Sequence, residues 1–150
     1  MFYYVVLTTS GEASPPSFSA WSVEALMREV AEHRDEVDEL DLKWSYGDSP
    51  YFCYHQENFS ELKTLFLRRP RMNTSMTDSE WNTEYELRFR ALECALKELD
   101  DEGLFGVGEE RRRIVINVEV MPPDRTNTER AKRLNPPDCL LEWLAENDQS

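Results

Sequence analysis

The sequence predicts an α+β fold, with a small β-sheet covered by amphipathic helices in a single domain of residues 1–150. The chain has the length of one domain, and its hydrophobic fraction of 40% is enough for a core. Two runs of β-branched and aromatic residues, at residues 2–8 and 114–120, have the composition of strands. Segments with apolar residues at helical spacing separate and follow these runs, which predicts a sheet covered by helices.

The N-terminal segment predicts a buried strand, a loop and a helix. Residues 2–8 are apolar on both faces, which is typical of a strand inside a sheet rather than at its edge. Residues 10–17 are rich in Ser, Gly and Pro and predict a loop. A helix is expected from about residue 20 to residue 37, because apolar residues recur there on one helical face. These residues are Trp21, Ala25, Leu26 and Val30.

The next segment predicts a second strand and a turn. Leu42, Trp44 and Tyr46 alternate with polar residues, as expected for a half-buried strand. Residues 47–50, with the sequence Gly-Asp-Ser-Pro, have the composition of a turn. Further aromatic residues continue as far as Tyr54.

The second half of the chain predicts helices around one further strand. A short helix is expected at residues 59–66, and a capping box from Thr77 to Glu80 predicts the start of a long helix that stops near Gly103. The strand at residues 114–120 is expected to bury one face only, because its residues alternate. Ile114, Ile116, Val118 and Val120 point one way, and Val115, Asn117 and Glu119 point the other.

Two short helices are expected at the C-terminal end. Residues 126–129 have the sequence Thr-Asn-Thr-Glu, a second capping-box pattern that opens a helix to about Leu134. Residues 135–137, Asn-Pro-Pro, end that helix. The last helix is amphipathic, and its apolar residues are Leu140, Leu141, Trp143 and Leu144.

The charge balance is the largest departure from an ordinary composition. The chain has 30 acidic and 17 basic residues, which give a formal net charge of -13. Such a chain repels nucleic-acid phosphates and anionic lipids, so we expect neither nucleic acid nor membrane as a partner. A basic protein would be attracted and steered onto it. The alternative is that the acidic surface only keeps the protein soluble.

The cysteines and the N-terminal residues indicate a cytoplasmic protein. Cys53, Cys94 and Cys139 are odd in number and widely spaced, without a CxxC pair or a Cys/His cluster. We therefore expect reduced thiols, with neither a disulfide framework nor a zinc site. The apolar run from Phe2 to Leu7 is too short to span a membrane and has no preceding basic region of a signal peptide.

No motif predicts a catalytic residue, a metal site or a cofactor. His33 lies in an acidic helix, and His55 follows a cysteine by two residues without a third group to orient a nucleophile pair. The glycines of residues 103–108 follow a helix, so they indicate a helix stop rather than a phosphate-binding loop. Two arginine clusters, at residues 68–71 and 111–113, could bind a phosphate or carboxylate, although such clusters more often pair with nearby acids.

The most distinctive local group surrounds the predicted turn. Its members are Trp44, Tyr46, Asp48, Tyr51 and Tyr54. Aromatic residues beside a turn can form a recognition surface, because Tyr and Trp are enriched in interface hot spots. They can equally pack in the core, with Asp48 capping the turn. For Trp44 the packing interpretation is the favoured one.

Several segments resemble a family of uncharacterised bacterial proteins known only as a domain of unknown function. The longest are LKWSYGDSPY at residues 42–51 and NVEVMPPD at residues 117–124. The others are TTSGEA, SAWS and DEGLFG, which begin at residues 8, 19 and 101. The resemblance implies a bacterial source and brings no established activity or site residues. It also implies a helical segment before the first strand, so an upstream helix missing from this chain is one expectation.

The first functional hypothesis is an immunity or inhibitor protein that binds a cognate basic toxin or effector and neutralises it. The small size and acidic charge are similar to those of immunity proteins in toxin–antitoxin and contact-competition systems. The aromatic group around the turn would anchor the partner, and acidic residues would steer its approach. These acidic residues are Glu32, Asp35, Glu36, Asp100, Asp101 and Glu102.

Two other hypotheses remain open at this point. One is an enzyme or small-ligand-binding domain, whose pocket would join Trp44, Asp48 and Asp124 and use an arginine cluster. The other is mimicry of nucleic acid by rows of carboxylates. That hypothesis requires regularly spaced acids on one face, which the helix at residues 24–36 provides only loosely.

Overall fold

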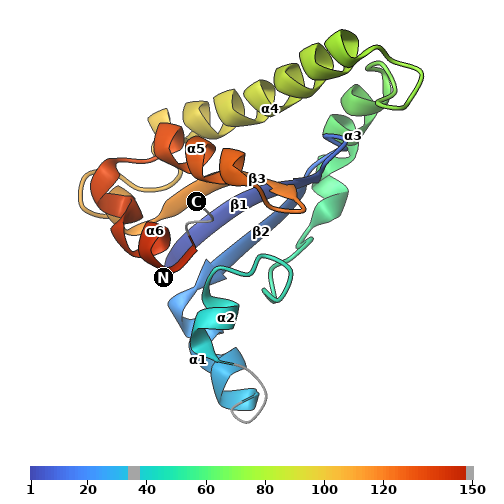
Figure 1. Ribbon diagram of the computed structural model, residues 1–150. Coiled ribbons are helices and arrows are strands. Elements are labelled where there is room, and N and C mark those ends of the chain that lie inside the picture. Colours follow the sequence, from blue (N-terminus) through green and yellow to red (C-terminus); the bar gives the residue numbers. More distant parts are fainter. Residues whose placement is uncertain (34–37, 148–150) are drawn as a thin grey trace.

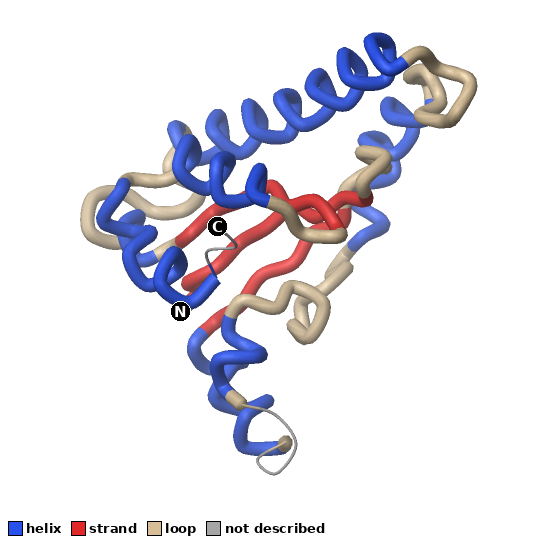
Figure 2. The backbone as a smooth tube through the Cα atoms, viewed as in Figure 1, coloured by secondary structure: helices blue, strands red, loops and turns tan. Residues whose placement is uncertain are grey.

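The computed structural model describes residues 1–33 and 38–147 and shows a single small α+β domain. Within these residues, the fold contains one three-stranded sheet and six α-helices, which confirms the predicted α+β class with a small sheet covered by helices. The sheet lies in the middle of the molecule, and the helices surround it on several sides (Figure 1; Figure 2).

The central strand of the sheet is β1 (Phe2–Ser10), which confirms that the first strand lies inside the sheet. Its neighbours are β2 (Ser17–Ser22), which runs antiparallel to it, and β3 (Val115–Met121), which runs parallel to it. The parallel pairing requires a long connection across the fold, and most of the helices of the chain lie in that connection.

The second strand corrects the predicted start of the first helix. The structure places residues 17–22 in β2, where Ala20 pairs with Val5 of β1. The helix α1 (Val23–Glu32) begins only after Ser22, whose hydroxyl caps it by accepting a hydrogen bond from the Ala25 amide. Trp21 matched the helical spacing by coincidence, and pairing with β1 decided its conformation. The predicted end of this helix, residues 34–37, lies outside the described residues.

The strand predicted around Trp44 is wrong, because these residues form a short helix and a turn. The helix α2 (Glu39–Lys43) starts at Asp38, whose carboxylate accepts a hydrogen bond from the Leu40 amide. Leu42 is buried within this helix, and Trp44 ends it. In a segment this short, burial of every second residue does not distinguish a strand from one helical turn.

The connection to the third strand contains the two helices that the sequence predicted there. A short 3-10 turn at Gln56–Phe59 leads into α3 (Ser60–Leu67), and the long helix α4 (Asp78–Asp101) follows. The capping box is confirmed: Thr77 Oγ1 accepts from the Glu80 amide, and Glu80 accepts from the Thr77 amide. In Figure 1, α4 crosses the molecule along one side of the sheet.

The prediction that β3 buries one face only is wrong, because both faces of the sheet are covered. On one face, aliphatic residues of β1 and β3 pack against α4; they are Val5, Leu7, Ile116, Val118 and Val120. On the other face, Tyr4, Val6 and Val115 pack with Trp21, Trp44 and Trp143. The polar residues Asn117 and Glu119 of β3 are buried on this second face.

The C-terminal helices close the second face. The helix α5 (Arg125–Leu134) is capped by the Asp124 carboxylate, which accepts from the Thr126 amide, so the predicted cap at Thr126 is wrong by two residues. A 3-10 turn at Pro137–Leu140 precedes α6 (Leu141–Asn147). The first residue of α6, Leu141, was expected on the apolar face and is instead exposed.

None of the described helices is long and apolar enough to cross a membrane.

Candidate functional site

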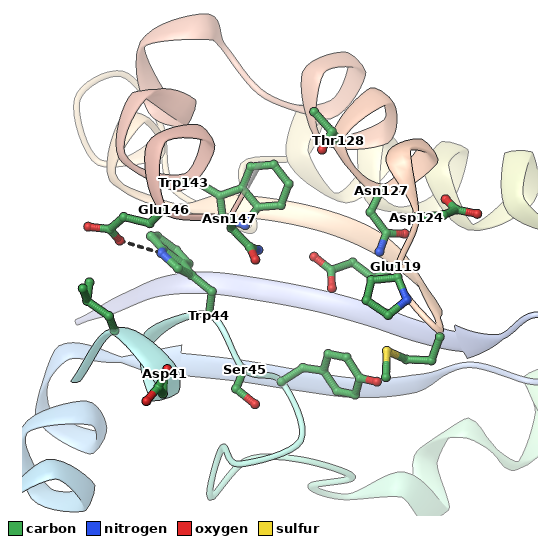
Figure 3. Close-up of a pocket in the computed structure, with 14 residues that line it drawn as sticks. Asp41, Trp44, Ser45, Glu119, Asp124, Asn127, Thr128, Trp143, Glu146 and Asn147 are labelled. Carbon is green, nitrogen blue, oxygen red and sulfur yellow. Dashed lines mark hydrogen bonds between the residues drawn. The ribbon is translucent and has the colours of Figure 1, made fainter. Parts of the chain in front are cut away.

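A pocket of about 310 Å³ opens on the second face of the sheet. The end of β3, the start of α5, the segment around Trp44 and the helix α6 enclose it (Figure 3). Three aromatic residues and three acids stand out among its lining residues: Trp44, Tyr46, Glu119, Asp124, Trp143 and Glu146. The two longest segments that resembled a known family, residues 42–51 and 117–124, both contribute to its wall.

Glu119 is the buried acid of the pocket, and it is 6% exposed. Its Oε1 accepts hydrogen bonds from the Tyr4 hydroxyl at 2.5 Å and from Asn117 Nδ2 at 3.1 Å. Burial raises the pKa of the Glu119 carboxyl above its usual value, against the opposing effect of these two hydrogen bonds. No described residue hydrogen-bonds to Oε2, and in Figure 3 the carboxyl group points toward Asn147 and Trp143.

Trp143 brings a second buried polar group to the pocket. The side chain is 1% exposed, and its indole Nε1 makes no hydrogen bond of normal geometry with a described residue. The nitrogen is nevertheless close enough to Tyr4 to lower the pKa of that hydroxyl, although burial and Glu119 raise the same pKa by more. A buried donor without a well-formed bond is costly, so this nitrogen is a group that a ligand could satisfy.

Trp44 forms the opposite wall and is tied to α6. Its Nε1 donates a hydrogen bond to Glu146 Oε2 at 2.8 Å, and the Lys43 Nζ lies 5.2 Å from the centre of its ring. The same lysine pairs with Glu146 at 2.9 Å. Hydrogen bonds from Lys43 and Trp44 lower the pKa of Glu146, which therefore carries its negative charge at neutral pH.

The end of β3 and the start of α5 hold the remaining wall rigidly. Asn127 accepts a hydrogen bond from the Val120 amide at 2.8 Å and donates one to the Val120 carbonyl at 3.3 Å. Arg130, which is 3% exposed, donates to the Val118 carbonyl at 2.6 Å and to Asn127 Oδ1 at 2.6 Å. These bonds fix α5 against β3 and so place Asp124 at the pocket margin.

Other hollows are larger but contain fewer buried polar groups that a ligand could bind. A groove of about 540 Å³ between α3 and α4 is lined almost entirely by apolar side chains such as Phe66 and Leu99. A groove of about 770 Å³ between α4 and α5 contains Arg133, which pairs with Glu93 at 2.8 Å. Neither contains a buried carboxyl group like that of Glu119, so the smaller pocket is the stronger candidate.

The structure brings together two of the three residues predicted for a ligand pocket. Trp44 and Asp124 both line the pocket, whereas Asp48 does not. Asp48 is exposed and accepts a hydrogen bond from the Ser45 hydroxyl at 2.5 Å, as expected of a turn residue. No arginine is among the described residues that line this pocket.

The aromatic residues predicted as anchors divide between core and surface. Trp44 is buried, in agreement with the packing interpretation, and Tyr46 is half-buried at the pocket. Tyr51 is half-buried and packs edge-on against Tyr54, with ring centres 6.0 Å apart. Tyr54 is 55% exposed, so it is the predicted tyrosine that is most available to a partner.

The acidic residues predicted to steer a partner are not gathered on one surface. Glu32 is exposed at the end of α1, whereas residues 100–102 lie at the end of α4, well separated from it in Figure 1. Asp35 and Glu36 lie outside the described residues. Asp101 pairs with Lys97 at 2.7 Å, and Glu102 is exposed.

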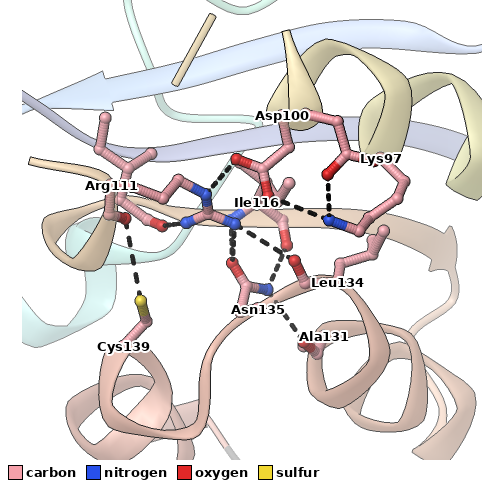
Figure 4. A network of polar contacts seen from close by, with 10 residues as sticks. Lys97, Asp100, Arg111, Ile116, Ala131, Leu134, Asn135 and Cys139 are labelled. Carbon is pink, nitrogen blue, oxygen red and sulfur yellow. Dashed lines mark hydrogen bonds and ion pairs between the residues drawn. The ribbon is translucent and has the colours of Figure 1, made fainter. Parts of the chain in front are cut away.

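Asp100 belongs to a buried network rather than to an open surface (Figure 4). Its carboxylate accepts a hydrogen bond from Arg111 Nε, and the same guanidinium donates to the Leu134 carbonyl and to Asn135 Oδ1, each at 3.2 Å. Asn135 then donates to the Ile116 carbonyl at 2.7 Å. The arginine thus pairs with a nearby acid, which joins the end of α4 to β3 and α5.

One group of side chains has the spacing of metal ligands. Glu29, Glu32 and His33 at the end of α1 each offer an atom within 4.8 Å of the others. Glu32 and His33 are exposed, and Glu29 also pairs with Arg28 at 3.4 Å. Exposed acids commonly approach each other in this way, and no second observation marks a site here.

The sequence interpretation missed Glu119 and Trp143 as site residues. It placed Asn117 and Glu119 on the exposed face of a strand, and it assigned Trp143 only to the apolar face of the last helix. The sequence did contain a hint, because a strand that only packs in the core rarely has an amide and an acid at alternate positions between Val residues. Their burial depends on α6, which is distant from β3 in the sequence.

The comparison with known families gives a match over most of the chain. A family described as a domain of unknown function (DUF4303) matches residues 1–136, which is most of the chain.

The chain belongs to the DUF4303 family.

The match confirms the expectation of an uncharacterised domain family, and the matched range includes the Glu119 and Trp44 sides of the pocket. The α6 side, with Trp143 and Glu146, lies after the matched residues. No curated protein and no solved structure matches this DUF4303 chain.

Proposed function

We propose that this DUF4303 protein is a small-ligand-binding domain and that its binding site is the pocket around Glu119. The observation that carries the proposal is the buried carboxyl of Glu119, which lines a pocket together with Trp143, whose buried indole nitrogen makes no hydrogen bond of normal geometry with a described residue. Buried polar groups normally satisfy one another, so two that meet at a pocket favour a ligand that completes them.

The local architecture supports ligand binding. The carboxyl of Glu119 is fixed by Tyr4 and Asn117, and α5 is fixed to β3 by Asn127, so the pocket is pre-formed. A pre-formed pocket binds without the cost of ordering its side chains.

A pocket-blocking variant tests this proposal. Asn147 is half-buried and points into the pocket in Figure 3, so Asn147→Trp would fill the space. Ala145→Trp is the matched control, because Ala145 is exposed on the same helix and does not line the pocket. The probe is a fragment set of small amines, carboxylic acids, alcohols and amides, with binding followed by the indole N–H signals of the tryptophans in NMR spectra.

We expect at least one fragment to shift the Trp143 signal in the wild type and in Ala145→Trp, and not in Asn147→Trp. Trp81, which stacks on Tyr85 in α4 at 4.8 Å, is an internal control that should not move. The proposal is wrong if no fragment shifts the Trp143 signal, or if the blocked variant responds as the wild type does.

The exposed aromatic loop supports a second proposal, the immunity or inhibitor function in the cytoplasm. Phe52 and Tyr54 are 39% and 55% exposed, and Cys53 and His55 beside them hold left-handed backbone angles, φ of 56° and 51°. Such conformations are unfavourable for residues other than glycine and often mark functional loops. An exposed aromatic loop on a chain of charge -13 would suit a basic protein partner.

This second proposal is tested by pull-down of the tagged protein from native lysate at low and physiological salt. A basic partner should be retained at physiological salt, and Tyr54→Ala should weaken its binding by about thirtyfold or more, as expected for a hot-spot residue. Glu102→Gln, which removes one exposed charge, should have a smaller effect. The anchor role of Tyr54 fails if the charge change abolishes binding and the aromatic change has no effect.

A further inference from the structure

We propose that the Glu119 pocket selects a small organic ammonium ion that also carries an oxygen acceptor, such as an amino alcohol. The inference rests on the ligand-binding function proposed above and names the class of ligand. Three features of the pocket support it: the charge of its wall, the arrangement of its two buried polar groups, and its size.

The part of the pocket wall that the described residues form is acidic. Among the described residues that line it there are four acids and no Lys, Arg or His. The acids are Asp41, Glu119, Asp124 and Glu146. The nearest bases are already engaged, because Lys43 pairs with Glu142 at 2.6 Å and with the pocket acid Glu146 at 2.9 Å, and Arg130 donates to backbone and amide oxygens. This field attracts a cation and repels an anion.

Glu119 provides the anchor for the cation at the centre of the pocket. Its Oε1 accepts both protein hydrogen bonds, so Oε2 is the oxygen that a ligand N–H can reach. Burial raises the pKa of the Glu119 carboxyl, and a bound cation would lower that pKa again, because an opposite charge nearby stabilises the carboxylate. Binding of an ammonium ion therefore favours loss of the Glu119 proton at any pH where the free protein still holds it, whereas binding of a neutral ligand does not.

Trp143 provides the anchor for the oxygen. Its Nε1 is a donor only, it is buried, and it has no well-formed hydrogen bond to a described residue. The nitrogen lies close to the Tyr4 hydroxyl, the same hydroxyl that donates a hydrogen bond to Glu119 Oε1, so the indole and the carboxyl of Glu119 are near each other. A ligand that offers an ammonium group to Glu119 and an oxygen to Trp143 would satisfy both groups at once.

The aromatic walls and the volume agree with such a ligand. The Trp44 ring already has one ammonium beside it, since Lys43 Nζ lies 5.2 Å from its centre, and Tyr46 adds a second ring to the wall. A volume of about 310 Å³ corresponds to roughly ten water-sized groups. The ligand is therefore a small molecule and not a polymer.

The test compares three probes of nearly equal size: ethanolamine, ethylene glycol and glycolate, which are cationic, neutral and anionic at neutral pH. Indole N–H signals report binding at Trp143, and calorimetry in two buffers of different ionisation enthalpy counts released protons. We expect ethanolamine to shift the Trp143 signal and release up to one proton per ligand. Its binding should strengthen as the pH rises, because Glu119 must lose a proton.

Two charge variants isolate the role of Glu119. Glu119→Gln should weaken ethanolamine binding by about tenfold to a hundredfold and remove the proton release, since a charge-assisted hydrogen bond is lost. Glu102→Gln makes the same Glu-to-Gln substitution at an exposed side chain outside the pocket wall, so it should bind ethanolamine as the wild type does.

The outcomes separate the two proposals. The inference of a cationic ligand is overturned if ethylene glycol or glycolate binds as tightly as ethanolamine. It is also overturned if Glu119→Gln binds ethanolamine as the wild type does. In both cases the proposed ligand-binding function still stands. The inference of a cationic ligand also fails if ethanolamine does not bind while other fragments shift the Trp143 signal. If no fragment of any charge shifts Trp143, the ligand-binding function fails as well.

Discussion

The two faces of the central sheet are built from the same two strands and differ in chemistry. On the α4 face, Val5, Ile116 and Val118 pack with Phe89 and Leu92 in an aliphatic and aromatic core. On the opposite face, the neighbouring positions hold Tyr4, Asn117 and Glu119, all buried and joined by hydrogen bonds. Strand alternation separates the two sets completely, because successive side chains point to opposite faces.

The difference between the faces indicates that one contributes mainly to stability and the other to binding. The α4 face excludes water and needs no specific geometry beyond close packing, so its contribution is stability. The face with Glu119 buries groups that are costly to bury, and each of them needs a partner. Such groups beside a pocket therefore indicate a functional role, because close packing alone does not require them.

The largest expected effect comes from the α4 face. Leu92→Ala removes a side chain that is 4% exposed in the core and should lower the free energy of unfolding by about 3 kcal/mol, because it leaves a cavity. Urea denaturation measures this change. The Trp143 response to ligand should persist in the folded variant, and a loss of binding together with the stability would show that the two faces are not independent.

The pH dependence of stability should distinguish the polar face. The raised pKa of Glu119 means that the folded protein keeps its proton to a higher pH than the unfolded chain, whose pKa is near 4.5. The contribution of Glu119 to stability is thus complete below about pH 4.5 and falls as the pH rises toward the folded pKa. The loss is about 1.4 kcal/mol for each pH unit that separates the folded from the unfolded pKa.

Urea denaturation of the wild type and of Glu119→Gln from pH 4 to pH 8 measures this effect. The difference in unfolding free energy, wild type minus variant, should decrease with rising pH, because Gln does not titrate. The other acids titrate in both proteins and cancel in the difference. Parallel pH profiles would contradict a raised pKa of the buried Glu119 carboxyl.

The smallest expected effect compares two helix caps, one on each face. Thr77→Ala removes the cap of α4, and Asp124→Ala removes the cap of α5. Each should cost about 1 kcal/mol, which thermal or urea unfolding can resolve. Only Asp124→Ala should also alter ethanolamine binding, because Asp124 lines the pocket. Equal binding changes in both variants would mean that the pocket responds to general destabilisation.

Sequence reasoning succeeded where a local signal agreed with the final environment. The capping box at Thr77 and the doubly apolar β1 are both confirmed, because local hydrogen bonds and strand composition act over a few residues. It failed at Trp21 and Leu42, whose spacing fitted the wrong element. In both segments the conformation depends on contacts with residues distant in the sequence, such as the pairing of Ala20 with Val5.

Only part of the candidate site could be predicted from the sequence. Trp44 and Asp124 were proposed as pocket residues and do line the pocket, whereas Asp48 remained in its turn. Glu119 was assigned to a solvent-facing strand face. That assignment was reasonable for an isolated strand, since one face of a strand is usually solvated when nothing is known to cover it.

The sequence by itself determined the α+β class, the central strand, the long capped helix and the acidic charge, because these depend on composition, periodicity and local hydrogen bonds. Only the tertiary structure decided that α6 covers the second face of the sheet and that Glu119 therefore lies buried beside Trp143. The physical reason is that burial and pKa are properties of the surroundings, and these surroundings come from segments distant in the chain.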